Sequence, residues 1–385
     1  MPYDVSVAAC GTYAPADCRR ALEEVLEPLG GLAWVKPGMR VAVKANLVAG
    51  MAPERAATTH PALLLALTQL LRERGANVVI GDSPGGLYTA AFVEKIYKAA
   101  GLYPVEAAGA ELNRNFAQAQ AVFPQAYVAK TFCYTQYLTE ADAVINFCKL
   151  KSHGMMGMSA AVKNLFGAIP GTLKPEYHFR YPDPRDFARM LVDLNAYFRP
   201  VLHIVDAVMA MEGNGPTQGT PRPMGALLAS QSSHQLDLAC AWLIGLERSR
   251  VPTLEAALER QWVPPKVEDL RIAGDLARFR AADFQKLETP SSLLFRGRRG
   301  TGWEKLQGKL IQKLLGARPQ VSPERCIGCG KCAGLCPAKA IVMTNGRPDI
   351  RRAACIRCFC CQEFCPVGAM EVRRTAIAKI LNRQE

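Results

Sequence analysis

Short apolar runs alternate with amphipathic stretches through the first 290 residues of the chain. Strand-like runs occur at residues 5–9, 39–48, 77–82, 141–147, 201–208 and 226–230. Helix-like patterns follow them at 16–31, 60–75, 88–101, 159–169 and 235–246. Strands that alternate with helices of this length are typical of βαβ units. The pattern predicts an α/β domain over residues 1–290, with a mostly parallel sheet and flanking helices.

The pattern changes at residues 291–320. This segment opens with a basic stretch, SSLLFRGRRGTG, and continues as an amphipathic run with its apolar side chains on one helical face. Those residues are Trp303, Leu306, Leu310, Ile311 and Leu314. We predict a basic linker whose helix packs on a neighbouring domain. A second interpretation, that the helix lies on an anionic membrane surface, stays open.

Cysteines mark residues 321–385 as a further, small domain. Nine of the fourteen cysteines fall between 326 and 365, and a helix-like pattern follows at 374–382. The chain shows no signal-peptide pattern and no apolar run near the ~20 residues that span a bilayer. We therefore expect a cytoplasmic protein, in which crowded cysteines indicate metal binding rather than disulfides.

Two cysteine runs, RCIGCGKCAGLCP (325–337) and ACIRCFCCQEFCP (354–366), share the spacing C-x2-C-x2-C-x3-C-P. In bacterial iron–sulfur proteins with this spacing, the fourth cysteine of each run binds the cluster of the other run. The predicted ligands of one [4Fe–4S] cluster are Cys326, Cys329, Cys332 and Cys365. The predicted ligands of the second are Cys355, Cys358, Cys361 and Cys336. Zinc usually takes separated cysteine pairs, so a zinc site is disfavoured.

The residues between the ligands add detail to this prediction. Gly328, Gly330 and Gly334 are expected to let the first loop bend closely around its cluster. Cys360 breaks the repeat and could replace Cys361 as a ligand, but Cys361 keeps the spacing, so we interpret Cys360 as a bystander. The cysteines outside this region are expected to be mostly buried thiols: Cys10, Cys18, Cys133, Cys148 and Cys240.

The cysteine-rich segment resembles the two-cluster bacterial ferredoxins over about 60 residues. The resemblance implies a small α+β domain with two [4Fe–4S] clusters that passes single electrons at low potential.

Polar residues gather where strands of the large domain are predicted to end. Lys44 and Asn46 close one strand, and the turn GDSPGG (81–86) leads from the next strand toward a helix. Ligands of open α/β sheets bind at such strand ends, and glycine-rich turns before helices offer N–H groups to anions. The turn matches no nucleotide-binding motif, so an ordinary turn with a helix-capping Ser83 is favoured over a nucleotide site.

The segment 146–171 carries the strongest candidate site of the large domain. Lys149, Lys151, His153 and Lys163 lie within 15 residues, with no acidic residue until Glu176. We expect these four on one loop before a helix N-terminus, where they would bind an anion or a carboxylate. His178 could join them, and a zinc or nickel site at the two histidines is a weaker alternative.

A fourth segment, 203–223, contains Asp206, Glu212 and a Gly/Pro-rich stretch. The two acids could balance the lysines, bind a metal or act as acid and base. A long surface connection explains the same residues equally well.

Together these blocks, KANLV, GDSPGG, CKLKSHGMMGMSAAVKNLFGAIPG and VDAVMAMEGNGP, resemble domain-of-unknown-function family 362 over nearly the whole chain. The family often has proline before the first lysine of the third block, where this chain has Cys148. The resemblance implies an iron–sulfur or ferredoxin-like protein of an anaerobe and no particular reaction.

The net charge of +13 is concentrated late in the chain, since 291–320 holds seven basic residues and one acidic residue. Two functions fit. The leading hypothesis is an iron–sulfur oxidoreductase, in which two clusters serve a redox site that holds a small anionic substrate. The alternative is a non-catalytic electron carrier or adaptor whose basic linker docks an acidic redox partner. Whether the chain is an enzyme stays open.

Two further classes are disfavoured. No stacking platform or recognition motif accompanies the basic residues, so nucleic acid is not the expected partner. Purely structural clusters would not need two centres placed for electron exchange.

Overall fold

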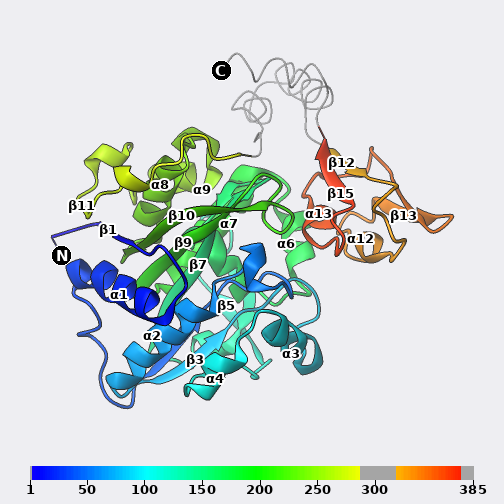
Figure 1. Ribbon diagram of the computed structural model, residues 1–385. Helices are drawn as coiled ribbons and strands as arrows, with labels where there is room; N and C mark the ends of the chain where they lie inside the picture. Colours follow the sequence, from blue (N-terminus) through cyan, green and yellow to red (C-terminus); the bar gives the residue numbers. More distant parts are fainter. Residues whose placement is uncertain (1, 287–317, 374–385) are drawn as a thin grey trace.

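The computed structural model describes residues 2–286 and 318–373, and its centre is a nine-stranded sheet (Figure 1). The strands lie in the order β11-β1-β10-β9-β7-β2-β3-β4, and β8 pairs with β7. Their bounds are β1 Val5–Ala9, β2 Arg40–Lys44, β3 Asn77–Gly81, β4 Glu111–Leu112, β7 Ala143–His153, β8 Gly157–Ser159, β9 Leu202–Glu212, β10 Thr220–Ser230 and β11 Ile272–Ala273. Strands β5 (Gln118–Val122) and β6 (Thr131–Thr135) form a separate hairpin.

Most neighbouring strands run parallel, as predicted. The series β9-β7-β2-β3-β4 is parallel throughout, and β11 is parallel to β1. Two strands are exceptions. Strand β10 runs antiparallel to both neighbours, β1 and β9, and a short loop joins it directly to β9; β8 runs antiparallel to β7. The predicted α/β class is confirmed.

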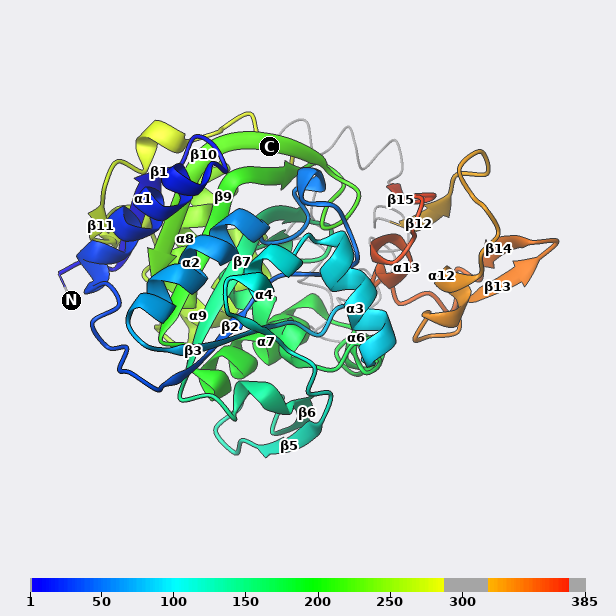
Figure 2. The same ribbon diagram turned by 60° about the horizontal axis from the view of Figure 1, so that its bottom comes forward.

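Helices cover both faces of the sheet (Figure 2). Their bounds are α1 Pro15–Leu26, α2 Pro61–Glu73, α3 Ala90–Ala99, α4 Tyr103–Ala107, α5 Ala161–Asn164, α6 Lys174–Arg180, α7 Pro184–Phe198, α8 Ser233–Leu243 and α9 Pro252–Glu259. Side chains alternate across each strand, so Val41 and Val43 of β2 pack into the core with α1 and α2, whereas Ala42 packs into a core on the opposite face. Strands buried on both faces read as nearly continuous apolar runs, as these do.

Strand β7 differs from the sequence prediction. Lys149, Lys151 and His153 were expected on a loop, but they belong to this 11-residue strand, in which every residue is buried. The cause is β8, which folds back and pairs antiparallel with the end of β7, placing Lys151 opposite Ser159. The expectation of a loop is therefore wrong for these three residues, and also for Lys163, which lies in α5.

The small domain (orange to red in Figure 1) contains paired antiparallel strands and two short helices. Strand β12 (Arg318–Val321) pairs with β15 (Met370–Arg373), and β13 (Ile341–Thr344) pairs with β14 (Arg347–Ile350). Helices α12 (Lys331–Gly334) and α13 (Cys360–Glu363) occupy equivalent places in the two cysteine runs. The first described strand of this domain begins at Arg318, and most of the predicted linker at 291–320 and the helix at 374–382 lie outside the described residues.

Candidate anion site and cysteine loops

A cavity of about 60 Å³ lies where the carboxyl ends of β2, β3 and β7 meet. Its cationic and imidazole lining consists of Lys151, Lys163, Lys174 and His178. The small domain contributes Glu363 and Phe364 to the same cavity. The remaining lining residues are Asn46, Val48, Asp82, Gly85, Ser159, Asn164, Phe166, Gly167 and Pro216. We call this space the cation pocket.

Lys44 and Asp82 form a closed ion pair at the base of the cation pocket. Lys44 Nζ lies 2.7 Å from Asp82 Oδ1, and both side chains are almost fully buried. Asp82 Oδ2 also accepts the backbone N–H of Leu47 at 2.7 Å. A Cβ at Gly167 would lie 2.1 Å from Asp82 Oδ1, so only glycine fits there. The pair leaves little charge for a ligand.

Lys149 and Asp206 form a second closed pair, outside the lining of the cation pocket. Lys149 Nζ lies 2.5 Å from Asp206 Oδ2, and both side chains are fully buried. Tyr13 Oη donates to Asp206 Oδ1 at 2.9 Å and accepts from Lys149 Nζ at the same distance. Of the acids in the fourth segment, Asp206 thus balances a lysine, while Glu212 accepts the backbone N–H of Gln285.

Lys151 is a buried cation with only neutral hydrogen-bond acceptors. Its Nζ donates to Asn46 Oδ1 and to the carbonyl of Ala57, each at 2.8 Å. Burial, together with the nearby charge of Lys163, lowers the pKa of Lys151 to about 7. An anion that reached Lys151 would restore its protonated form.

His153 points its Nε2 at the small domain. Its Nδ1 accepts backbone N–H groups from Met155 at 3.1 Å and Met156 at 3.2 Å. The neutral ring therefore carries its proton on Nε2, which lies 3.4 Å from Glu363 Oε1 but forms no hydrogen bond among the described residues. Burial lowers the pKa of His153 to about 4, so the ring is neutral.

Glu363 is the one acid that the small domain brings to these cations among the described residues. Its Oε1 also lies 3.9 Å from Lys163 Nζ, and its side chain is 13% exposed. Burial alone would raise the pKa of Glu363, but the charge of Lys163 and the contact with His153 lower it below its ordinary value. The carboxylate is therefore ionised.

Lys174 and His178 come from α6, which runs along the cation pocket. Lys174 Nζ donates to the carbonyl of Ser83, and burial lowers the pKa of this lysine to about 8. His178 stacks on Phe187 with ring centroids 4.4 Å apart, and its buried Nδ1 has no hydrogen-bond partner among the described residues. Within those residues, no three His, Cys, Asp or Glu side chains converge on a single-ion site, so the alternative zinc or nickel site at His153 and His178 lacks a third ligand.

Two backbone donors of the glycine-rich turn at 81–86 are used internally. Ser83 N donates to the carbonyl of Gly167 at 3.0 Å, and Gly85 N donates to that of Val48 at 3.1 Å. Helix α3 begins only at Ala90. These N–H groups are thus unavailable for a phosphate, and the turn serves to shape the cation pocket.

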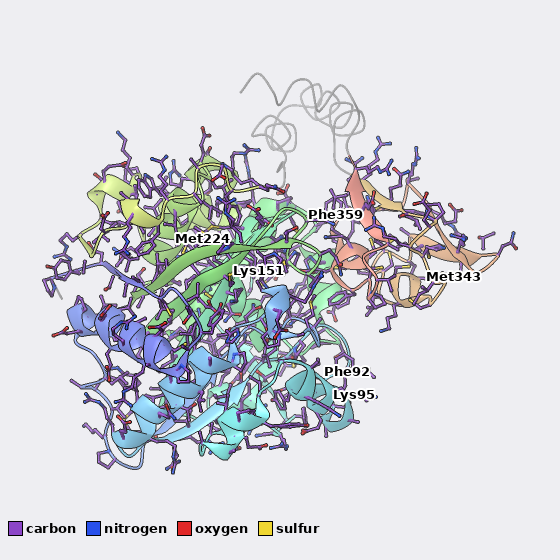
Figure 3. All side chains as sticks on the ribbon, viewed as in Figure 1. Phe92, Lys95, Lys151, Met224, Met343 and Phe359 are labelled. Carbon is purple, nitrogen blue, oxygen red and sulfur yellow. The ribbon has the colours of Figure 1, made fainter. Side chains whose placement is uncertain are left out.

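The loop between β9 and β10 holds the small domain in place. Thr217 Oγ1 donates to the carbonyl of Glu363 at 3.0 Å, and Gln218 Nε2 donates to that of Cys365 at 3.1 Å. Gln362 Nε2 in turn donates to Asn214 Oδ1 at 3.1 Å. Figure 3 shows Phe359 on the side of the small domain that faces the large one, and Met343 on the far side. The second cysteine run is therefore the one docked beside the cation pocket.

The cysteines of the first predicted set surround a common space. Cys326, Cys329, Cys332 and Cys365 all line a cavity of about 20 Å³ whose other walls are mainly apolar. In the second predicted set, burial and the charges of Cys358 and Cys336 raise the pKa of Cys355. The thiols that raise the pKa of Cys361, besides burial, are those of Cys358, Cys355, Cys336 and also Cys332 of the first set. The division of the cysteines into two ligand sets stays a prediction.

Backbone groups support both sets of thiols in the same way. Ala340 N donates to Cys336 Sγ at 3.2 Å, and Ala369 N donates to Cys365 Sγ at 3.1 Å. Such N–H···S bonds favour thiolates and tune cluster potentials. Cys360, the predicted bystander, is buried beside Cys358.

Fold and cysteine arrangement define an iron–sulfur protein with an electron-transfer role. The chain matches the 4Fe-4S dicluster domain over residues 318–366 and the domain of unknown function DUF362 over residues 41–242. It belongs to the DUF362 family, with a 4Fe–4S ferredoxin domain after it, as the sequence resemblance indicated.

A relative from Synechocystis, named as a thylakoid-associated protein, is 35% identical over 277 residues, which cover 70% of this chain and 83% of the relative. No helix within residues 2–286 and 318–373 combines the length and apolar character needed to cross a membrane.

Two solved structures are also similar. The lactate racemase apoprotein of Thermoanaerobacterium thermosaccharolyticum has a TM-score of 0.41 and 12% identity, over 63% of this chain and 57% of that one. A protein of Thermotoga maritima has a TM-score of 0.36 and 15% identity, over 54% and 53%. The chain thus spans little more than half of each, and neither likeness bears on function.

Sequence reasoning brought together Lys151, His153 and Lys163, which the structure also places side by side. It missed Lys174 and Glu363. Lys174 stands before proline at the start of a short helix, a position typical of surface lysines. Glu363 lies within a cysteine run, where only the docking of the two domains reveals its role.

Proposed function

We propose that this protein binds two [4Fe–4S] clusters and couples them to a small anion bound in the cation pocket. One observation carries the proposal. Glu363 and Phe364 lie between two predicted cluster ligands, Cys361 and Cys365, and also line the cation pocket. A ligand there would lie next to a cluster loop, within reach of electron exchange.

The cysteine residues would hold the clusters in the two interlaced sets given above. When bound, the clusters supply one-electron transfer at low potential. The backbone bends tightly around each set, with positive φ at Gly328 and Gly330 in the first run and at Arg357 and Phe359 in the second. The matching conformations support equivalent roles for the two runs.

Residues of the large domain would bind and orient the anion. Lys151 and Lys163 supply charge, and His178 supplies a ring nitrogen without a partner among the described residues. The rings of Phe166 and Phe364 keep bulk water away, which strengthens these electrostatic contacts. Lys149, which is neutralised by Asp206, would fix β7 rather than touch the ligand.

The test begins with protein purified without oxygen. Iron and acid-labile sulfide should each reach about eight per chain if two cubes are present. Small carboxylates should then change the EPR spectrum of the reduced protein, and Lys163→Ala should abolish this response. Lys36→Ala, which removes an exposed lysine of the large domain, is the matched control. If no small anion changes the EPR spectrum, the proposed coupling between the clusters and the cation pocket is wrong.

The charge of residues 291–320 supports a second candidate, an electron carrier or adaptor that docks an acidic redox partner through its seven basic residues. Association by charge weakens as salt rises. Replacing Arg296, Arg298 and Arg299 by Gln should slow electron exchange with an acidic ferredoxin-type partner at low salt. A rate unchanged by salt and by this variant would contradict it.

The proposal places the protein in the cytoplasm. None of the fourteen cysteines, all of which lie in the described residues, forms a disulfide, as expected in a reducing compartment.

A further inference from the structure

The cation pocket already holds an anion, which is the carboxylate of Glu363. Its Oε1 lies 3.4 Å from His153 Nε2 and 3.9 Å from Lys163 Nζ, and the side chain is largely buried. A carboxylate of the small domain therefore occupies the place that the proposed function gives to a ligand.

The cluster loop itself does not require an acid at this position. The two cysteine runs are 29 residues apart, so Gly334 and Leu335 of the first run correspond to Glu363 and Phe364 of the second. A Cβ at Gly334 would meet nothing within 4 Å, whereas Phe364 lies against Gly85 of the large domain. An acidic residue at this position therefore occurs only in the second run, which lies beside the cation pocket.

Glu363 does not balance the charge around it. Asp82 is already paired with Lys44, which leaves Lys151, Lys163 and Lys174 of the lining facing one carboxylate. Lys151 and Lys174 donate only to neutral oxygens, and burial lowers their pKa values to about 7 and about 8, so an added anion would favour their charged forms. The cation pocket thus has capacity for more negative charge than Glu363 supplies.

The available donors favour a carboxylate over a phosphate. They are ammonium groups and imidazole N–H groups, while Ser83 N and Gly85 N of the glycine-rich turn donate to backbone carbonyls. The free volume of about 60 Å³ adds room for roughly four to six water-sized groups beside Glu363. Both features fit an organic acid of a few carbon atoms.

We propose that Glu363 occupies the carboxylate subsite of the cation pocket and that a small organic acid binds by taking its place beside His153 and Lys163. This inference rests on the proposed function and adds the ligand class and an internal competitor. Glu363 and the acid compete for one subsite. The contacts that stabilise Glu363 there therefore lower the affinity for the acid by the same factor.

Calorimetry on the cluster-loaded protein, with acetate, succinate and inorganic phosphate as probes, tests this inference. Both carboxylates should bind more tightly than phosphate. Glu363→Gln keeps the side chain's size but removes its charge, and Glu363→Ala also empties the subsite. Affinity for acetate should rise in the order wild type, Gln, Ala, and by at least about tenfold at Ala.

Glu324→Gln, an exposed acid of the same domain, is the matched control and should leave acetate affinity unchanged. Iron content reports whether each variant keeps its clusters, and the isosteric Gln variant preserves the test if Ala misfolds. Equal acetate affinity in wild type, Gln and Ala would overturn the inference while leaving the proposed function intact. Equal gains in Gln and Ala would also overturn it, since charge repulsion alone explains that result. No binding of any probe to any variant would overturn both.

Discussion

The two cysteine runs share one spacing but meet different surroundings. In the first, Cys329 is exposed and the neighbouring Ile327 is 65% exposed. In the second, Cys360, Cys361 and Cys365 are all buried. The cause is docking, because only the second run lies against the large domain.

The difference shows how a repeated motif acquires two roles. The ligand positions and the left-handed backbone positions are kept, while the side chains between them diverge. In the second run, Gln362, Glu363 and Phe364 bind the large domain. Under the proposed function, the exposed first run faces an external electron partner, and the second run faces the cation pocket.

The largest expected effect comes from breaking a ligand in the second run. Cys361→Ser should remove one of the two proposed clusters and lower iron and sulfide by about half, because a cube needs its four thiolates. Cys360→Ser, one residue away, should leave both unchanged. Iron and sulfide analysis with EPR checks this, and the reverse outcome would make Cys360 the ligand.

A substitution in the large domain can also disturb the docking of the second cysteine run. At Gly85, a Cβ would lie 1.7 Å from the ring of Phe364, so Gly85→Ala should push this ring out of the cation pocket. Hydrogen exchange should then speed up in the β9–β10 loop at residues 213–219. Gly11→Ala, whose Cβ would meet no atom within 4 Å, is the control. Unchanged exchange in Gly85→Ala would show that the contact is not needed for docking.

Acid binding should depend on pH through Lys151, whose pKa burial lowers to about 7. A lysine with a lowered folded-state pKa binds fewer protons when folded than when unfolded, so its deprotonation adds stability as pH rises from about 7 toward the ordinary lysine pKa. Acid binding should change the opposite way, because it needs the ammonium form. Acetate affinity should fall up to about tenfold per pH unit above pH 7, and Lys151→Gln should flatten this slope. If acetate affinity falls with pH just as steeply in Lys151→Gln, the pH dependence comes from a group other than Lys151.

The smallest effect concerns backbone strain in the first run. Gly330 has φ of +71°, so Gly330→Ala should destabilise the domain by about 1 kcal/mol. Gly334→Ala, at the end of α12, should be neutral or mildly stabilising, since helices favour alanine. Thermal unfolding without oxygen measures both. Equal effects would mean that the left-handed turn is not what Gly330 provides.

Local pattern predicted much of the fold. The run at 5–9 coincides with β1, and the helix predicted at 60–75 appears as α2, Pro61–Glu73. These elements follow from hydrophobic periodicity, which is visible in the sequence itself. The extent of β7 did not follow, because its polar end is stabilised by pairing with β8 and with the distant β9 and not by apolar residues.

The site was predictable in part for the same reason. Lys151, His153 and Lys163 are close in sequence, so their proximity was visible. The neutralisation of Lys149 by Asp206 joins residues 57 positions apart, and the approach of Glu363 to His153 depends on how two domains dock. Pair formation over such separations leaves no local pattern in a single sequence.

A potentiometric titration of the cluster-loaded protein, followed by EPR with and without saturating acetate, tests the link between the small domain and the cation pocket most directly. We predict two midpoint potentials, of which acetate shifts one, that of the cluster held by the second run, and leaves the other in place. Two potentials that both stay fixed while calorimetry shows acetate bound would contradict the link.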